Sequence, residues 1–168
     1  TTSEPMFDSL IRFVREQYAT NDFIPLHAPV FHGRERELVM DTLETTFVSS
    51  VGAYVDRFEQ DMAKFTGSPR AVAVTNGTAA LHIALLLAGV ERGDLVATQS
   101  LTFVATCNAL AYCSAEPLFI DVDRHTLGLS PTALDAWLEQ HAQIDDHGNC
   151  RTKNGNRRIR ACLPMHTF

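Results

Sequence analysis

The sequence predicts a three-layer α/β fold with a mostly parallel sheet, preceded by helices. From residue 70 onward, short apolar runs alternate with helical patterns through short connections, as in right-handed crossovers between parallel strands. Before residue 67, hydrophobic residues recur at helical spacing instead, which indicates amphipathic helices. We therefore expect an N-terminal helical segment, 1–66, packed on a large α/β domain of which 67–168 is the first part.

Three helices are expected in the first segment. Their apolar stripes are Phe7, Leu10, Ile11, Val14 and Tyr18, then Leu38, Val39, Leu43 and Phe47, then Val55, Phe58, Met62 and Phe65. Gly67 follows the third stripe and is suited to end that helix, because glycine readily adopts the left-handed conformation common after helices.

Strands and helices alternate in the second segment. The run AVAVT, 71–75, has the continuous apolar character of a strand buried on both faces, and a wholly apolar helix follows it and stops at Gly89. The later expected elements are a strand over 94–100, a helix over 103–115, a strand over 117–123, a helix capped by Ser130 and begun by Pro131, a polar surface excursion over 145–158 and a final strand from 159 onward. That last strand pattern stops without a turn, cap or polar tail, so the sequence looks cut mid-fold.

Composition argues against several classes of partner. The formal charge of −6 comes from acidic residues spread along the chain, which does not suggest nucleic acid or an anionic membrane surface. The four cysteines lack paired C-x-x-C spacing, and we find neither a signal peptide nor an apolar run of eighteen residues. We expect a reduced, soluble, cytoplasmic protein.

The segment TNGTA, 75–79, opens the apolar helix at the carboxyl end of the first expected strand. Ligands bind at this end of open α/β sheets. Gly77 lets the chain pass close to a ligand, Thr78 offers a hydroxyl, and the amides of Thr78 and Ala79 begin the helix, so together they can cradle a phosphate. A plain helix N-cap at a tight turn explains the same residues equally well.

Phe103 stands at the corresponding turn after the next strand, within SLTFVATCNA, 100–109. An aromatic ring there can lie flat against a planar ligand whose phosphate the first helix holds. For a lone phenylalanine, core packing is the alternative explanation.

Other groups do not form a recognisable catalytic or metal centre. Lys64 and Lys153, the only lysines, fall on a polar helix face and in the exposed excursion, unlike a desolvated lysine of lowered pKa. His141, His147 and Cys150 lack a fourth ligand at recognised spacing, so no metal is expected, and Asp121 and Asp123 fit solvated carboxylates at the end of a strand. Dinucleotide, P-loop and hydrolase signatures are absent from the sequence.

Most of the chain resembles the DegT/DnrJ/EryC1/StrS family of pyridoxal-phosphate-dependent sugar aminotransferases, which have fold type I. The segments that carry the resemblance are PLHAPVFHGRERELV, VSSVGAYVDRFE, AVTNGTAALHIALLLAGV, LTFVATCNALAYC and FIDVDRHTLGLSP. The similarity is strongest to the branch that aminates C4 of a nucleotide-linked 4-keto-6-deoxy sugar, as in bacillosamine and legionaminic acid pathways.

The resemblance implies roles for individual residues. Gly77, Thr78 and Ala79 would hold the phosphate of pyridoxal phosphate, and Phe103 would stack on its ring. A family segment near the sugar site corresponds to the loop that contains Ser50, Gly52 and Tyr54, and His166 is expected to end a strand that faces the same site. The resemblance also implies glutamate as amino donor and a homodimer.

The family's lysine that binds the cofactor covalently, and the acid that pairs with its ring nitrogen, would follow Phe168. We therefore expect no catalytic residue in this chain and no activity from it alone. Two alternatives stay open: the same fold can act as a sugar dehydratase in which histidine replaces the lysine, or the chain can be a truncated, non-catalytic ligand-binding or interface domain.

Overall fold

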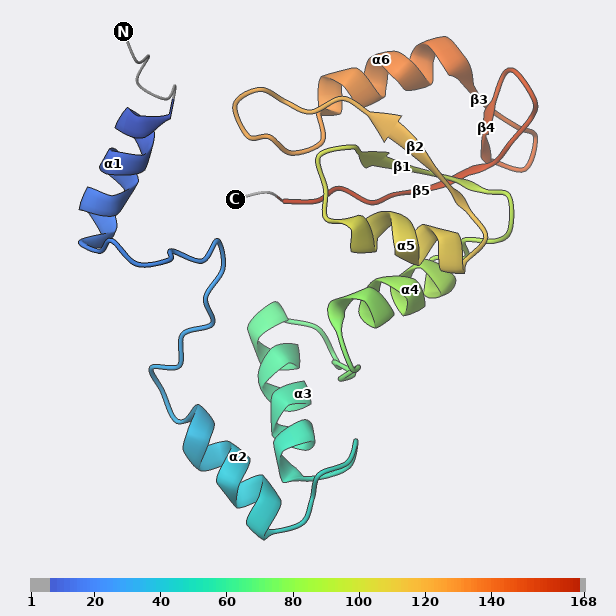
Figure 1. The fold of residues 1–168 in the computed structure, drawn as a ribbon. Coiled ribbons are helices and arrows are strands. Elements are labelled where there is room, and N and C mark those ends of the chain that lie inside the picture. The colour runs from blue at the N-terminus through green and yellow to red at the C-terminus, as the bar shows by residue number, and fades with distance from the viewer. Residues whose placement is uncertain (1–6, 167–168) are drawn as a thin grey trace, which may run out of the picture. The chain divides into compact units, whose positions relative to one another are not determined.

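The computed structural model of the chain describes residues 7–166. Figure 1 shows its helices and strands, which fall into two compact units, one up to Arg57 and one from Phe58 onward. The division lies within helix α3. No helix in the described range is long and apolar enough to cross a membrane.

Helices form the regular structure of the first unit. They are α1 (Asp8–Tyr18), α2 (Glu35–Glu44) and the start of α3 (Ala53–Thr66), which confirms the three predicted helices, although Phe47 lies beyond the end of α2. Leu10 and Ile11, on the apolar stripe of α1, are at least half exposed. The first unit therefore does not bury this stripe.

The second unit contains the α/β part of the chain. Its further elements are α4 (Gly77–Leu87), β1 (Leu95–Gln99), α5 (Val104–Tyr112), β2 (Glu116–Ile120), α6 (Pro131–His141), β3 (Ala142–Ile144), β4 (Cys150–Thr152) and β5 (Ile159–Cys162). The main sheet has the order β2-β1-β5, and both pairings are parallel. The α/β fold with a parallel sheet is thus confirmed.

The central strand β1 organises three layers. Figure 1 shows α6 on one face of the sheet and α4 and α5 on the other. All five residues of β1 are buried, since neighbouring strands and both helical layers cover it. The hydrophobic core lies between the sheet and the pair α4 and α5; its buried members are Leu85, Val90, Val96, Ala109, Leu110, Cys113 and Ala115.

Helix ends follow the predicted signals. Ser130 caps α6 by accepting a hydrogen bond from the Ala133 N–H at 3.2 Å, and Pro131 is the first helical residue. After α4, Gly89 adopts a φ of 76°, and the Val90 N–H donates to the Leu85 carbonyl at 3.0 Å. This arrangement closes the helix while placing Val90 in the core.

The predicted strand over 71–75 is wrong, because residues 71–74 form no regular structure. Val72 is 80 % exposed, and the Ala73 N–H donates to the Glu59 side chain at 2.7 Å rather than to another strand. Strand propensity reflects packing against neighbours, and the two edges of β1 are already occupied by β2 and β5. The outer edges of β2 and β5 do not pair with the apolar run either, so it has no strand partner within the described residues.

The C-terminal part differs from the prediction in two places. The predicted surface excursion over 145–158 contains the strand β4, which pairs with β3 in an antiparallel hairpin that the sequence analysis did not predict. At the turn of this hairpin, Asp145 accepts hydrogen bonds from the N–H groups of His147 and Asn149. The final strand ends at Cys162 rather than running to His166. Proline has no N–H to donate to a ladder, so Pro164 limits the extension of this strand.

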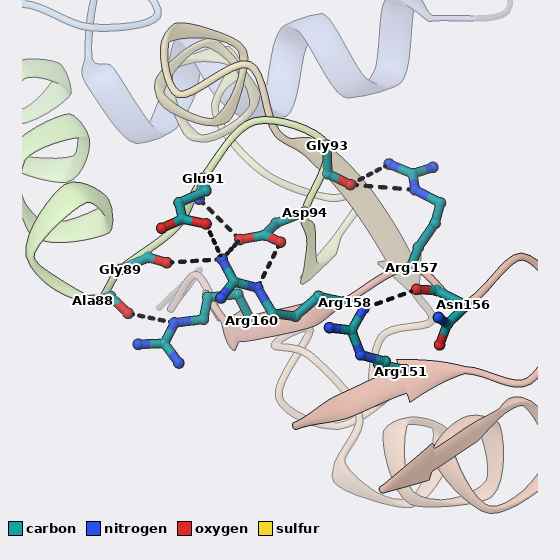
Figure 2. A network of polar contacts seen from close by, with 10 residues as sticks. All are labelled: Ala88, Gly89, Glu91, Gly93, Asp94, Arg151, Asn156, Arg157, Arg158 and Arg160. Atoms are coloured by element: carbon teal, nitrogen blue, oxygen red, sulfur yellow. Dashed lines mark hydrogen bonds and ion pairs between the residues drawn. The ribbon is translucent and has the colours of Figure 1, made fainter. Parts of the chain in front are cut away.

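An ion-pair network joins the amino end of β1 to the segment that enters β5 (Figure 2). Asp94 is 5 % exposed, and its carboxylate accepts hydrogen bonds from Arg158 at 2.8 and 2.7 Å and from the Glu91 N–H at 2.8 Å. Burial alone raises the pKa of Asp94, but the hydrogen bonds from Arg158 and Glu91 outweigh it and hold the pKa below its ordinary value. The pair therefore stabilises the folded chain.

Asp94→Asn should lower the free energy of unfolding by about 3 kcal/mol, because Arg158 then keeps only the exposed Glu91 carboxylate as an ionic partner. Since the folded pKa of Asp94 is lowered, its contribution is present above about pH 4 and is lost as the pH falls through the folded value. Urea unfolding at several pH values measures both effects.

Glu116→Gln is the matched control. Glu116 pairs at 2.8 Å with Arg157, the residue before Arg158, but the side chains of Glu116 and Arg157 are 64 % and 37 % exposed. The loss of unfolding free energy should therefore stay below about 1 kcal/mol. Equal losses for the two variants would contradict the assignment of Asp94 as the main contact.

Candidate cofactor-binding site

The beginning of α4 offers backbone amides to a ligand. Asn76 is the N-cap, in extended conformation, and its side-chain oxygen accepts a hydrogen bond from the Ala79 N–H at 2.9 Å. The amides of Gly77 and Thr78 have no acceptor within their own helix, because the first N–H groups of a helix lack intrahelical partners. The sequence-based hypothesis used Thr78 and Ala79; in this structure Asn76 competes for the Ala79 amide, whereas the Gly77 amide stays available.

Gly77 is open on the side where a side chain would project. A Cβ built there meets no atom within 4 Å, and its φ lies outside the left-handed range. Neither packing in the described chain nor backbone conformation requires glycine at this position. Close approach by a bound group would require it, so the open position is compatible with a phosphate at the helix N-terminus.

Phe103 is the N-cap residue of α5 and is 73 % exposed. The alternative of core packing therefore does not hold within the described residues. A phenyl ring displayed at the start of a helix is available to stack on a planar ligand. The stacking role itself remains a prediction.

The two helix N-termini share one end of the sheet. Helix α4 packs against α5, and Figure 1 shows both helices beginning on the side toward which the β1 arrow points. Ligands in α/β sheets bind outside the carboxyl ends of the strands. The arrangement brings the Gly77 turn and Phe103 to the edge where the fold places ligands.

Three residues expected to contact the sugar belong to the first unit of the chain. Ser50, Gly52 and Tyr54 belong to the loop before α3 and its first turn. Gly52 and Tyr54 line a hollow of about 250 Å³, and Ser50 does not. The Tyr54 hydroxyl donates to Asp41 at 2.7 Å, and this hydrogen bond raises the pKa of Tyr54. Tyr54 is thus held within its own unit, and its role toward a sugar remains a prediction.

His166 is exposed and lies four residues beyond β5. It follows Met165, whose N–H donates to the buried side chain of Gln99 at 3.2 Å. The expected position at the end of a strand is therefore wrong, but the segment that carries His166 is anchored at the carboxyl edge of the sheet.

Sequence reasoning assigned no structural contact to two polar side chains that shape this unit, Asn76 and Lys153. Asn76 could have been found, since asparagine is among the preferred N-cap residues. Lys153 gave no such signal; its ammonium group donates to the carbonyls of Glu139 and Gln140 at 2.7 and 3.1 Å, at the C-terminus of α6.

The remaining polar candidates have structural partners. Within residues 7–166 no three His, Cys, Asp or Glu side chains are grouped closely enough to hold a metal ion. The Asp123 side chain accepts hydrogen bonds from the N–H groups of Thr126 and His125, which hold its pKa below the ordinary value. Asp123 therefore organises the loop after β2.

Comparison with known proteins identifies the family. The pattern of the DegT/DnrJ/EryC1/StrS aminotransferase family matches residues 30–144. The chain belongs to this family. The family is pyridoxal-phosphate-dependent, so the residues predicted to hold the phosphate and the ring, at the Gly77 turn and at Phe103, can be compared with that cofactor. Open amides, a glycine without packing demands and an exposed aromatic ring do fit a phosphorylated planar ring.

Two curated relatives show how far the similarity extends along the chain. GDP-perosamine synthase from Caulobacter vibrioides is 41 % identical over 86 % of this chain and 34 % of its own length. A putative pyridoxal phosphate-dependent aminotransferase, EpsN, from Bacillus subtilis is 42 % identical over 70 % of this chain and 30 % of its own length. The chain thus spans about a third of the curated relatives it matches.

Solved structures agree with the fold. The crystal structure of an aminotransferase from Psychrobacter cryohalolentis has a TM-score of 0.61 and is 32 % identical, covering 67 % of this chain and 29 % of that one. The α/β unit described above is therefore part of a fold type I aminotransferase domain.

Phe103→Ala should weaken pyridoxal phosphate binding about tenfold while lowering stability by less than about 1 kcal/mol. Losing a stacking contact of about 1 to 1.5 kcal/mol corresponds to that factor, whereas truncating a buried phenylalanine costs about 3 to 5 kcal/mol. Equilibrium dialysis and urea unfolding measure the two quantities. Unchanged affinity with a large stability loss would show that the ring packs against protein.

Gly77→Ala should reduce affinity for pyridoxal phosphate at least about tenfold, since its Cβ would enter the space that a phosphate needs. Stability should stay within about 1 kcal/mol, because alanine favours helices and meets no atom here. Pyridoxal, which lacks the phosphate, is the matched ligand. An equal loss of affinity for both compounds would refute a phosphate contact at Gly77.

Proposed function

We propose that this chain is the N-terminal part of an enzyme that transfers an amino group from glutamate to a nucleotide-linked 4-keto-6-deoxy sugar, with pyridoxal phosphate as cofactor. The observation that carries the proposal is the 41 % identity to a GDP-perosamine synthase over 86 % of the chain. The exposed turn at Gly77 and the ring of Phe103 support the cofactor part of it.

Pyridoxal phosphate, when bound, carries the amino group between donor and acceptor and takes up the negative charge that develops on the reacting carbon. The chain's own residues bind and orient it: the amides of Gly77 and Thr78 and the Thr78 hydroxyl hold the phosphate, while Phe103 keeps the ring in one plane. Orientation of this kind lowers the barrier by fixing the reacting geometry in advance.

The sugar contacts of the proposed enzyme come from Ser50, Gly52, Tyr54 and His166. A homodimer in the cytoplasm is the assembly that we propose, because the family resemblance implies an active site shared between subunits. The nucleotide-sugar substrate and glutamate are its small-molecule partners.

Neither lysine of the chain is suited to hold the cofactor covalently. Lys153 donates to two carbonyls at the end of α6, and Lys64 lies exposed in the last turn of α3, where a cation is favourable for the helix dipole. We propose that the required lysine lies outside these 168 residues, so that the chain by itself does not turn over.

The chain can be incubated with pyridoxal phosphate, reduced with borohydride and analysed by peptide mass spectrometry. We expect only substoichiometric attachment of the cofactor to Lys64 and Lys153. The protein purified from its source, with its mass measured, should convert glutamate to 2-oxoglutarate only when a nucleotide-linked ketosugar is present.

A stoichiometric adduct on Lys64 or Lys153, abolished by Lys64→Arg or Lys153→Arg, would overturn the assignment of the lysine. Consumption of the sugar without consumption of glutamate would favour a dehydratase on the same fold. Absence of any turnover by the source protein would leave ligand binding as its function and reject the aminotransferase.

A further inference from the structure

Gln99 is a wholly buried polar side chain at the end of β1. Its exposed fraction is zero, and its side-chain amide is bonded through both of its polar atoms. The nitrogen donates to the carbonyls of Leu101 and Leu127 at 3.1 and 3.2 Å, and the oxygen accepts from the Met165 N–H at 3.2 Å.

The three backbone partners of Gln99 belong to three different loops. Leu101 follows β1, Leu127 lies in the loop after β2, and Met165 lies beyond the end of β5. Each loop leaves the carboxyl end of a parallel strand, so one side chain joins all the loops that the sheet sends to this edge.

The chemistry of the side chain suits this role. A neutral amide is the side-chain group that offers two donors and an acceptor without carrying charge. Because the site is buried, water cannot replace a lost partner, and leaving two carbonyls and an amide unpaired is costly. A hydrophobic residue of the same size would fill the space but would release all three loops.

Two candidate ligand residues are close in sequence to these anchors. Phe103 lies two residues after Leu101, and His166 directly follows Met165. The hydrogen bonds of Gln99 therefore restrain the backbone next to both. Thr98, the neighbouring residue, makes a different contact: its hydroxyl donates to the Leu163 carbonyl at 2.8 Å, directly after β5.

We propose that Gln99 is a positioning residue that sets the placement of Phe103 relative to His166 at the carboxyl edge of the sheet. The proposal rests on the proposed function in taking this edge as the pyridoxal phosphate site. Gln99 acts through the loop backbones and does not itself contact the ligand.

The test compares Gln99→Met with the matched variant Thr98→Val in the 168-residue chain. Both remove buried hydrogen bonds from the same strand. Gln99→Met should speed hydrogen exchange of amides in 100–103, 125–129 and 163–166 at least about tenfold, while amides of α5 exchange as before. Thr98→Val should change 163–166 alone.

Pyridoxal phosphate affinity is the second readout. Gln99→Met should weaken binding at least about tenfold, and Thr98→Val should change it by less than about twofold. If the unaltered chain binds no pyridoxal phosphate, the proposed cofactor site fails in this chain, while the exchange pattern still decides whether Gln99 positions the loops.

A uniform rise in exchange across the second unit, or the same pattern for both variants, would overturn the proposal, since a purely structural residue would act in that way. Should Gln99→Met not fold, Gln99→Glu replaces it. That variant keeps an acceptor for the Met165 N–H but has at most one donor for the two carbonyls. Faster hydrogen exchange should therefore be confined to 100–103 and 125–129. Faster exchange of 163–166 in Gln99→Glu would also reject the positioning role.

Discussion

The second unit depends on the return of the chain to β1 after the long excursion that begins beyond β2. A loop of this length costs entropy to close, although the cost grows slowly with length. The buried pair of Asp94 and Arg158 meets that cost at the amino end of the strands, aided by the Leu95 N–H, which donates to the Arg158 carbonyl at 2.7 Å. With β5 held there, β1 has neighbours on both sides and its side chains can be wholly buried.

Charge is concentrated at that amino end. Figure 2 shows Arg157, Arg158 and Arg160 directed at the carbonyls and carboxylates around α4 and the start of β1. At the opposite, carboxyl end, the neutral side chains of Thr98 and Gln99 bond the loop backbones, and the Asp123 carboxylate organises the loop after β2. A phosphate at the Gly77 turn would therefore be met by backbone amides and the helix dipole rather than by these arginines.

The groups that stabilise the sheet are thus separate from the groups proposed to bind the ligand. The ion pairs secure the sheet far from the edge where Phe103 is displayed, so the groups proposed for the ligand are not needed to hold the core. Phe103 is exposed and a Cβ at Gly77 would meet no atom, which are features of residues whose identity the fold does not require. We propose pyridoxal phosphate, the cofactor of the family, as their ligand, and the amides of Gly77 and Thr78 are the ones at this turn that lack an acceptor within the helix.

The sequence by itself determined most element types, the parallel sheet, the helix ends at Ser130 and Gly89, and the family, because periodicity, capping residues and motif spacing are local properties of the chain. Tertiary structure decided the rest. The run at 71–75 is no strand, since pairing needs a neighbour that local propensity cannot supply. The three hydrogen-bond partners of Gln99 likewise cannot be predicted from the sequence, because residues far apart in the chain meet only once β5 lies beside β1.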